Sequence, residues 1–273
     1  MKKFVLLLLL TSYVSFAQTK NFLESEIISA GDSLKFIKIK TDTLLNSNQN
    51  ISFLIFPQKA FEKYKIEFAY NKKKLEQTSL FGINNNALVA INGSFFDMDS
   101  GGSVVYFEIN DSVLSITKPD SIKWAVPDSL VDGVVIITKD SRILIQAANV
   151  DSFYEQSKEE SAVLRSGPLL IFNSEKVKLP QMKFVSNRHP RTYLCNYNGS
   201  IIFITVDGRS EVGDGMTLIE AQNYLYDLGC NDAINLDGGG STTMWIKDKG
   251  VVNAPSDKTG ERPVANVLLI LKK

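Results

Sequence analysis

The sequence predicts an α+β fold: one strand-rich domain with mixed or antiparallel sheets and a few helices. Two observations lead to this class. Short segments of strand-forming residues recur along most of the chain, whereas only one segment shows an amphipathic helical pattern with signals for both of its ends. In addition, no internal repeat, low-complexity stretch or Pro/Gly/Ser-rich linker divides the chain. Because strands outnumber helices, we expect this class rather than a doubly wound parallel sheet.

The composition is that of a folded protein and excludes some classes of function. The 273 residues are 44% hydrophobic and carry 30 Lys+Arg against 30 Asp+Glu, with one His and two Cys. A formal net charge of zero provides no electrostatic footprint for DNA, RNA or an anionic membrane surface. One His and two Cys cannot supply the usual ligand sets of zinc sites. We therefore expect no nucleic-acid partner and no zinc.

The N-terminus has the form of a secretory signal peptide. Lys2 and Lys3 precede the short apolar run 4–10, and small residues at 15 and 17 provide a cleavage site after Ala17. The run is too short for a membrane-spanning helix of about 20 residues, although an uncleaved anchor is the alternative. We expect an exported protein, periplasmic or secreted, with no membrane span in the mature chain. Residues 1–17 are the predicted signal peptide, 18–80 an N-terminal strand-rich extension, and 81–273 the main domain.

The first two thirds of the mature chain contain strand signals bounded by turn residues. Expected strands cover residues 34–39, 51–56, 64–68, 87–91 and 169–172, and a hairpin joins 134–138 to 143–145. Ser166-Gly167-Pro168 introduces the strand at 169–172.

The last third is more regular. The run 201–206 is continuously apolar, which indicates a strand buried on both faces. Thr217 and Glu220 have the spacing of a capping box, and Gly229 ends the helix that they begin. Further strands are expected at 233–236 and 267–271, with a hairpin joining 244–246 to 251–252.

The two cysteines are far apart in the sequence. Cys195 lies in the strand-like stretch 192–196, and Cys230 follows the predicted helix end. An oxidising compartment permits a disulfide, but a chain of this length buries its own core and does not need one. We expect two buried free thiols, with a disulfide as the alternative.

A run of glycines marks the first candidate site. Asp237 follows the strand at 233–236 and precedes Gly238, Gly239 and Gly240, which the hydroxyl residues Ser241 and Thr242 follow. Consecutive glycines carry a high entropic cost, which a chain accepts where φ is positive or where another group approaches the backbone closely. A carboxylate, N–H groups and hydroxyls together suit a sugar or an anion. A tight turn without function is the alternative.

A basic segment forms the second candidate. Pro190 stiffens the chain between Arg188 and Arg191, and guanidinium groups bind phosphate and carboxylate. A surface pair that forms salt bridges is the alternative. His189 is expected to be structural or merely exposed, because no Gly-x-Ser-x-Gly elbow accompanies it.

Taken in order, these motifs resemble the phosphodiester glycosidase family. The matching segments are Asn92-Gly93-Ser94-Phe95-Phe96, Ser166-Gly167-Pro168, residues 188–192, Asp207-Gly208-Arg209, residues 217–221, residues 235–242 and Arg262-Pro263-Val264-Ala265-Asn266. The resemblance extends from about Ala87 to the C-terminus and does not cover the segment before about Leu80. It implies an exported hydrolase that cleaves the glycosidic bond of a sugar-1-phosphodiester or a related envelope glycan.

Such a reaction needs a carboxylate near the sugar and cations near the phosphate. We expect Asp237 to stabilise or attack the sugar or to orient water, and Arg191 to neutralise the phosphate. Asp207 and Arg209 would complete the floor of the pocket, and the glycine loop would supply N–H donors. The catalytic candidates are Asp237, Asp207 and Arg191. The substrate-binding candidates are Asn92, Gly93, Arg188, Arg209, Gly238, Gly239, Gly240, Ser241, Thr242 and Arg262.

Other residues carry weaker expectations. Phe95 and Phe96 are expected in the core rather than in a sugar platform, and Glu220 is expected to be a helix cap. Asp97, Asp99 and Asp214 have the chemistry of calcium ligands, but we assign no metal or other cofactor.

Two other functions use the same residues. A glycan-binding module without hydrolytic activity would need the same arginines and glycines. A phosphodiesterase that cleaves at phosphorus would need metal ions. All of these hypotheses require the arginine segment and the acid-plus-glycine segment to converge in space.

Overall fold

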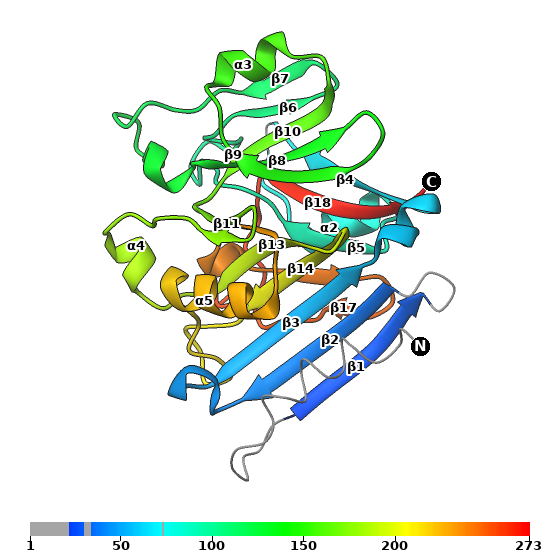
Figure 1. Cartoon of the computed structure of the whole chain (residues 1–273), viewed down its shortest axis with the longest axis vertical. Helices are drawn as coiled ribbons and strands as arrows, with labels where there is room; N and C mark the ends of the chain where they lie inside the picture. Colours follow the sequence, from blue (N-terminus) through cyan, green and yellow to red (C-terminus); the bar gives the residue numbers. More distant parts are fainter. Residues whose placement is uncertain (1–21, 30–33, 73) are drawn as a thin grey trace.

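Figure 1 shows the computed structural model, which describes residues 22–29, 34–72 and 74–273. The strands form three sheets, and every strand pair among the described residues is antiparallel. The large sheet has the order β1 (Phe22–Ser29), β2 (Leu34–Thr41), β3 (Gln49–Phe56), β14 (Ser200–Val206), β13 (Arg191–Tyr197), β15 (Asp232–Asn235), β11 (Leu169–Phe172) and β12 (Glu175–Lys176).

Two five-stranded sheets complete the strand framework. The upper sheet in Figure 1 has the order β7 (Ser112–Ser115), β6 (Phe107–Ile109), β10 (Glu160–Ser166), β8 (Gly133–Thr138) and β9 (Ile143–Ala147). The third sheet has the order β17 (Gly250–Val251), β16 (Met244–Ile246), β5 (Val89–Asn92), β18 (Asn266–Lys272) and β4 (Tyr64–Tyr70). The strand-rich α+β class is therefore confirmed, with antiparallel sheets.

Helices are short and few. They are α2 (Thr78–Asn84), α3 (Asp151–Gln156), α4 (Lys183–Ser186) and α5 (Leu218–Leu228), with 3₁₀ turns η1 (Leu44–Asn46), η2 (Gln58–Glu62), η3 (Asp128–Leu130) and η4 (Gly239–Ser241). None of the helices among the described residues is long and apolar enough to cross a membrane. The predicted signal peptide 1–17 lies outside the described residues.

The main hydrophobic core lies between the three sheets. It contains Leu54 of the large sheet, Leu164 of the upper sheet and Ile91 of the third sheet, all fully buried. The opposite face of each sheet packs against helices: α5 and α4 cover the large sheet, α2 the third sheet and α3 the upper sheet. Because all three sheets share this core, they form one unit with no linker between them.

The segment before residue 80 is part of this framework. β3 pairs with β14 along its length, from Ile51 opposite Val206 to Phe56 opposite Ile201. β4 pairs with β18 at the edge of the third sheet. The predicted extension therefore adds strands to two sheets. Asn50, beside β14, comes from this segment.

The most regular predictions agree with the structure. β14 is buried on both faces, as its apolar run indicates. The Thr217 hydroxyl accepts from the Glu220 N–H and the Glu220 carboxylate accepts from the Thr217 N–H, so α5 begins with a capping box. Gly229 ends it in the left-handed region with φ 90°. Phe95 and Phe96 lie in the core, as expected.

The prediction of two free thiols is wrong. Cys195 and Cys230 form a disulfide, with their Cα atoms 5.9 Å apart. β13 and β15 are neighbours, with Cys195 opposite Ala233, and the turn after α5 brings Cys230 back beside β13. The Cα separation is within the usual range of a disulfide. Only this strand pairing, which the sequence pattern did not reveal, places the two residues together.

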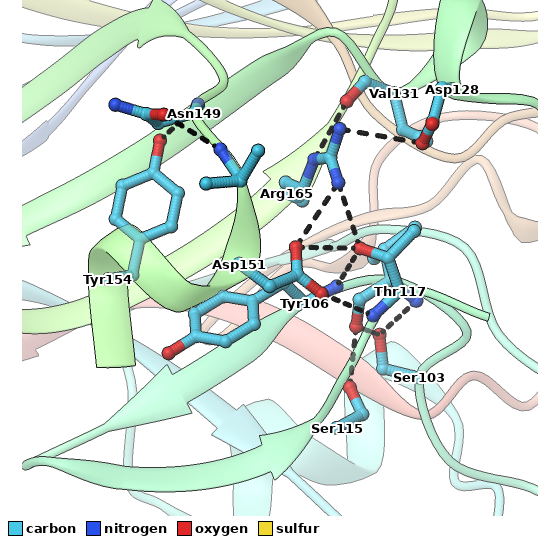
Figure 2. Close-up of polar contacts among 12 residues, drawn as sticks. Ser103, Tyr106, Ser115, Thr117, Asp128, Val131, Asn149, Asp151, Tyr154 and Arg165 are labelled. Atoms are coloured by element: carbon cyan, nitrogen blue, oxygen red, sulfur yellow. Dashed lines mark hydrogen bonds and ion pairs between the residues drawn. The ribbon is translucent and has the colours of Figure 1, made fainter. Parts of the chain in front are cut away.

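A polar network holds the upper sheet to its neighbouring segments (Figure 2). Arg165 of β10 donates from Nε to the Val131 carbonyl oxygen at 3.1 Å and from Nη1 to the Thr117 hydroxyl at 3.0 Å. Asp151, the first residue of α3, lies 3.2 Å from Arg165 Nη1 and accepts from the Thr117 N–H at 2.7 Å. None of the predicted site residues belongs to this sheet, so the network is part of the framework.

Candidate active site

The predicted site residues meet where strand ends of two sheets come together. Asp237 follows β15, and Arg191 begins the antiparallel neighbour β13, so both stand at the same edge of the large sheet. Asn92 ends β5 of the third sheet. The Asp237 N–H donates to the Gly93 carbonyl oxygen at 2.9 Å, and the Asn92 amide donates to the Asp237 carbonyl oxygen at 2.7 Å. These bonds join the two sheets at the candidate site.

Asp237 presents a partly exposed carboxyl group beside the glycine loop. Its Oδ1 accepts from the Gly238 N–H at 2.9 Å. Burial raises the pKa of this carboxyl, while the Ser241 hydroxyl, the Gly238 N–H, Arg262 and Arg191 oppose the shift. A carboxyl with a raised pKa that still reaches solvent suits proton transfer or nucleophilic attack.

The glycine loop allows other segments to pack directly on its backbone. A Cβ on Gly238 would lie 2.8 Å from the Pro190 carbonyl oxygen, and one on Gly240 would lie 2.1 Å from Asp257 Oδ1. Gly239 has φ 62°, and its N–H donates to the Pro190 carbonyl oxygen at 2.9 Å. The N–H groups of Gly238 and Gly239 are thus used within the protein, contrary to the expectation that they serve a ligand. Glycine is needed at positions 238 and 240 because a side chain would collide with the segments packed against the loop.

Arg191 lies beneath the site. Its side chain is almost fully buried, with the residue 1% exposed. Nε donates to the Met216 carbonyl oxygen at 3.1 Å, and Nη2 donates to the Phe184 and Asn187 carbonyl oxygens at 2.6 and 3.1 Å. The guanidinium also lies over the Phe184 ring. Arg191 contributes positive charge near Asp237, but these donors bind main-chain oxygens.

Arg188 is paired with the cap of α5. Its Nε lies 3.1 Å from each carboxylate oxygen of Glu220, and its Nη2 lies 2.5 Å from Oε1. Nη2 also donates to the Leu45 carbonyl oxygen at 3.0 Å. The salt-bridge alternative considered for this segment therefore describes Arg188.

Arg262 lies against the glycine loop together with Asp257, an acid that the sequence motifs did not indicate. Its Nε and Nη2 donate to the two carboxylate oxygens of Asp257 at 2.8 and 2.9 Å. A Cβ on Gly240 would lie 2.3 Å from Arg262 Nη2, so this pair rests against the glycine loop. Asp257 lies five residues before Arg262 in a segment without helix or strand, so no regular spacing along the sequence indicates that the two residues pair.

Arg209 is the exposed guanidinium of the site. A Cβ on Gly239 would lie 3.2 Å from Arg209 Nη1, which places this side chain over the loop. Nη2 lies 2.9 Å from His189 Nδ1. Every other arginine has its charge compensated or its donors bound to main-chain oxygens. Arg142, Arg165, Arg188 and Arg262 pair with carboxylates, and Arg191 binds carbonyl oxygens. Among the described residues, no carboxylate pairs with Arg209.

Asp207 is only 1% exposed, and its carboxylate connects three segments of the chain by hydrogen bonds. Its carboxylate accepts from the Asn50 and Asn253 amides at 2.5 and 3.0 Å and from the Ala254 N–H at 2.9 Å. Burial raises the pKa of Asp207, and these donors oppose the shift. The bonds tie the end of β14 to β3 and to the segment after β17. They therefore set the start of the loop that carries Arg209.

Neutral polar groups line the same junction. Asn92 Oδ1 accepts from the Thr192 hydroxyl at 2.8 Å and from the Thr243 N–H at 3.1 Å. The Ser241 and Thr242 hydroxyls are buried at the loop, and the Ser241 hydroxyl faces the Asp237 carboxyl. Together with Asp237 they place oxygen and nitrogen groups of the types that bind sugar hydroxyls near the loop.

A cleft of about 490 Å³ shares Asn266 with this junction. The Asn266 side-chain oxygen accepts from the Ser94 N–H at 2.7 Å, and its main-chain oxygen accepts from the Gly93 N–H at 3.0 Å. Lys72 and Lys118 line the cleft, with Asp97 as the acid in the lining. Asp97 accepts from groups of its own loop at Asp99 and Ser100 and stays ionised, so the two lysines leave the lining with one positive charge in excess.

The described residues contain no cluster of three or more His, Cys, Asp or Glu side chains that could hold a metal ion. The acids considered for calcium have other partners. Asp97 caps its own loop, Asp99 pairs with Lys123 at 2.6 Å, and Asp214 accepts from the Asn48 N–H at 2.9 Å.

Comparison with solved structures identifies the class of fold. The catalytic domain of zebrafish N-acetylglucosamine-1-phosphodiester alpha-N-acetylglucosaminidase, auto-inhibited by its pro-peptide, is similar with a TM-score of 0.62 and 19% identity over 94% of this chain and 83% of that chain. A hypothetical protein from Synechocystis is similar with a TM-score of 0.65 and 13% identity over 95% of this chain and 64% of that chain. At these identities the likeness shows a shared fold.

Comparison at the sequence level identifies the family. The phosphodiester glycosidase profile matches residues 85–271, and the chain belongs to this family. The SPbeta prophage-derived uncharacterized protein YomE of Bacillus subtilis (strain 168) is 29% identical in an alignment of 227 residues that covers 74% of this chain. The aligned part is 33% of that relative, so this chain spans about a third of its length.

Proposed function

We propose that this protein is an exported hydrolase that cleaves the glycosidic bond of a sugar-1-phosphodiester or of a related envelope glycan. One observation carries the proposal. The partly exposed Asp237 carboxyl and the uncompensated Arg209 guanidinium lie on the same glycine loop. This combination provides one group for the sugar and one for the phosphate.

Asp237 acts at the anomeric carbon. Cleavage there passes through an oxocarbenium-like state, which a carboxylate stabilises as a nucleophile, as a base for water or by charge alone. The raised pKa of Asp237 makes it a stronger base than an ordinary aspartate while the nearby arginines keep it ionisable.

Arg209 receives the phosphate. Its guanidinium fork matches two phosphate oxygens, and negative charge grows on them as the glycosidic bond breaks. Because a phosphodiester is already a good leaving group, the reaction needs no strong general acid. This reassigns the phosphate contact from Arg191, whose bonded donors face main-chain oxygens.

The residues behind this pair position it. Arg191 supports the loop from below and adds positive charge, and Asp207 holds the turn that leads to Arg209. The Arg262–Asp257 pair buttresses Gly240 on the other side. Arg188 supports the start of α5 through Glu220 rather than binding substrate directly.

The cleft at Asn266 provides space for the alcohol side of the phosphodiester. Lys72 and Lys118 give it the sign that attracts a polyanionic chain, such as a phosphate-containing envelope polymer. The sugar would instead lie at the loop beside Asp237, and the buried residues Asn92, Ser241 and Thr242 would support the loop from within.

Product analysis in ¹⁸O-labelled water tests the proposal. The protein is incubated with a panel of nucleotide sugars, sugar-1-phosphodiesters and teichoic-type polymers. A glycosidase yields free sugar labelled at its anomeric hydroxyl and an unlabelled phosphomonoester. Label in the phosphate would instead show a phosphodiesterase, and glycan binding without turnover would show a binding module. Either result contradicts the proposal, and Asp237→Asn is the matched inactive control.

The export part of the proposal has its own test. The signal-like residues 1–17 support it, and the Cys195–Cys230 disulfide suits an oxidising compartment. N-terminal sequencing of the protein recovered from the cell envelope or culture medium should begin at Gln18. Retention inside the cell with Met1 intact would contradict export.

A further inference from the structure

The main chain holds both residues of the contact between Arg209 and His189 in place. Arg209 Nη2 lies 2.9 Å from His189 Nδ1. The main chain of His189 exchanges two hydrogen bonds with Met216, at 3.2 and 3.1 Å. A Cβ on Gly215 would lie 2.4 Å from the His189 carbonyl oxygen, so the residue before Met216 must be glycine. Arg209 itself has φ 57°, at the tight turn after β14.

This contact defines the protonation state of the imidazole. A guanidinium group donates hydrogen bonds and remains protonated, so His189 Nδ1 must be the acceptor. The ring is then neutral, with its proton on Nε2. The surroundings favour the same state. Partial burial and the positive charges of Arg191 and Arg209 lower the pKa of His189 from 6.5 to about 4.

Among the described residues, no carboxylate is found to act on the imidazole. The groups that act on His189 are Arg191 of β13 and Arg209 of the loop after β14, and both favour the neutral ring. The other packed neighbours, Gly215 and Met216, do not titrate. The imidazole therefore remains an acceptor throughout the neutral pH range.

We propose that His189 is the positioning residue of the phosphate site: its neutral imidazole holds Arg209 over the glycine loop without consuming the charge of the guanidinium. This inference rests on the function proposed above. A carboxylate would anchor Arg209 as firmly, but it would cancel the positive charge, as Glu220 does for Arg188 and Asp257 does for Arg262. A neutral acceptor fixes the direction of Arg209 and leaves its remaining donors and its charge for phosphate.

Three substitutions of His189 test separately the need for a hydrogen-bond acceptor and the need for a neutral side chain. His189→Asn keeps an acceptor near the position of Nδ1 and carries no charge. His189→Asp has the same shape and adds a negative charge, and His189→Leu fills similar space without an acceptor. We expect kcat/KM for a sugar-1-phosphodiester to stay within about threefold in His189→Asn and to fall about tenfold or more in the Asp and Leu variants.

Binding of inorganic phosphate gives a readout that does not depend on turnover. Calorimetric titration at pH 7.5 should show weaker phosphate binding in the Asp and Leu variants by similar factors, with His189→Asn near wild type. Thermal unfolding of each variant identifies any that do not fold. His189→Asn and His189→Asp, which have the same shape, then remain the decisive comparison.

The imidazole can also be observed directly, because the chain contains a single histidine. In tag-free protein labelled with ¹⁵N-histidine, we expect Nδ1 unprotonated and Nε2 protonated at pH 7, with no titration above about pH 5. A ring protonated on Nδ1, or one that titrates near pH 6.5, would overturn the inference.

The outcomes separate this inference from the proposed function. Suppose that phosphate affinity falls in the Asp and Leu variants but not in His189→Asn, while the wild-type protein hydrolyses no phosphodiester. This result supports the role of His189 and contradicts the glycosidase. Turnover that is equal in all four proteins supports the glycosidase and contradicts the role of His189. Equal activity of the Asn and Asp variants would contradict the need for a neutral anchor.

Discussion

Asn92 and Asp237 lie 145 positions apart in the sequence, and the Asn92 side-chain amide donates to the Asp237 carbonyl oxygen at 2.7 Å. Asn92 ends a strand of the third sheet, and Asp237 follows a strand of the large sheet. The bond thus fixes the direction in which the Asp237 carboxyl leaves the backbone. The relationship shows how two motifs far apart in the sequence meet: Asn92 ends β5 and Asp237 follows β15, and the sheets bring these strand ends together.

Asp237→Asn should abolish sugar release without unfolding the protein. We expect kcat to fall about 1,000-fold or more, because the amide cannot act as base, nucleophile or compensating charge. A raised folded-state pKa means that ionisation of Asp237 destabilises the fold as pH rises. The melting temperature at pH 7 should therefore be unchanged or higher. Steady-state kinetics and calorimetry check both statements, and full activity would refute the role of Asp237.

Arg209→Gln should weaken handling of the phosphate. We expect kcat/KM to fall about 100-fold, because the amide keeps a donor for His189 but loses the positive charge. Arg142→Gln is the matched control, since Arg142 pairs with Asp140 at an exposed hairpin of the upper sheet. It should change kcat/KM less than twofold. Equal effects of the two substitutions would remove Arg209 from the site.

Lys118→Glu tests the cleft at Asn266. Reversal of charge in the lining should raise KM for a polyanionic substrate about three- to tenfold, with little change in kcat. The effect should diminish in high salt, because the interaction is screened. Lys59→Glu is the control: Lys59 is exposed in η2, after the end of β3 that lies away from Asn50. If the two variants show the same KM, the cleft does not bind the charged chain.

Removal of the disulfide should affect stability more than activity. Cys195 and Cys230 join the far ends of β13 and β15, away from Arg191 and Asp237. The double substitution to Ala should lower the free energy of unfolding by about 2–4 kcal/mol. Urea unfolding measures this change, and kcat at 25 °C should stay near wild type. A large loss of kcat in folded protein would show that the bridge also shapes the site.

Acid should destabilise the protein partly through His189. The folded-state pKa is lowered to about 4 from 6.5, so the unfolded chain binds more protons between these values. Stability contributed by this residue is present above about pH 6.5 and is lost as pH falls towards 4. We expect a loss on the order of 1 kcal/mol, discounted for the partial exposure of the ring. Urea unfolding of wild type and His189→Asn should diverge across this window, and parallel curves would contradict the shift.

The sequence motifs singled out one acid of the candidate site but could not rank its cations. Asp237 could be recognised because three glycines follow it, and the structure shows other segments packed against that backbone. Arg191 and Arg209 could not be ranked, because both are arginines beside turn residues. Arg191 turned out to face the Phe184, Asn187 and Met216 carbonyl oxygens, whereas Arg209 lies exposed over the loop.

The same limit applies to His189 and the cysteines. The expectation that His189 is structural or exposed did not include its contact with Arg209, since their loops are brought together by β13 and β14. Asn50 and Asn253, which hold Asp207, come from segments without a motif. Such partners are defined by strand pairing rather than by spacing along the chain.

The sequence alone determined the strand-rich class, the position of the α5 helix with both caps, the family, and Asp237 with its glycines. These features depend on local patterns: alternation of apolar residues, capping residues and backbone positions that admit only glycine. The tertiary structure decided which guanidinium reaches solvent, which thiols pair and which ring supports Arg209. Each of those outcomes depends on contacts between residues far apart in the chain, and only the pairing of the strands determines which of them meet.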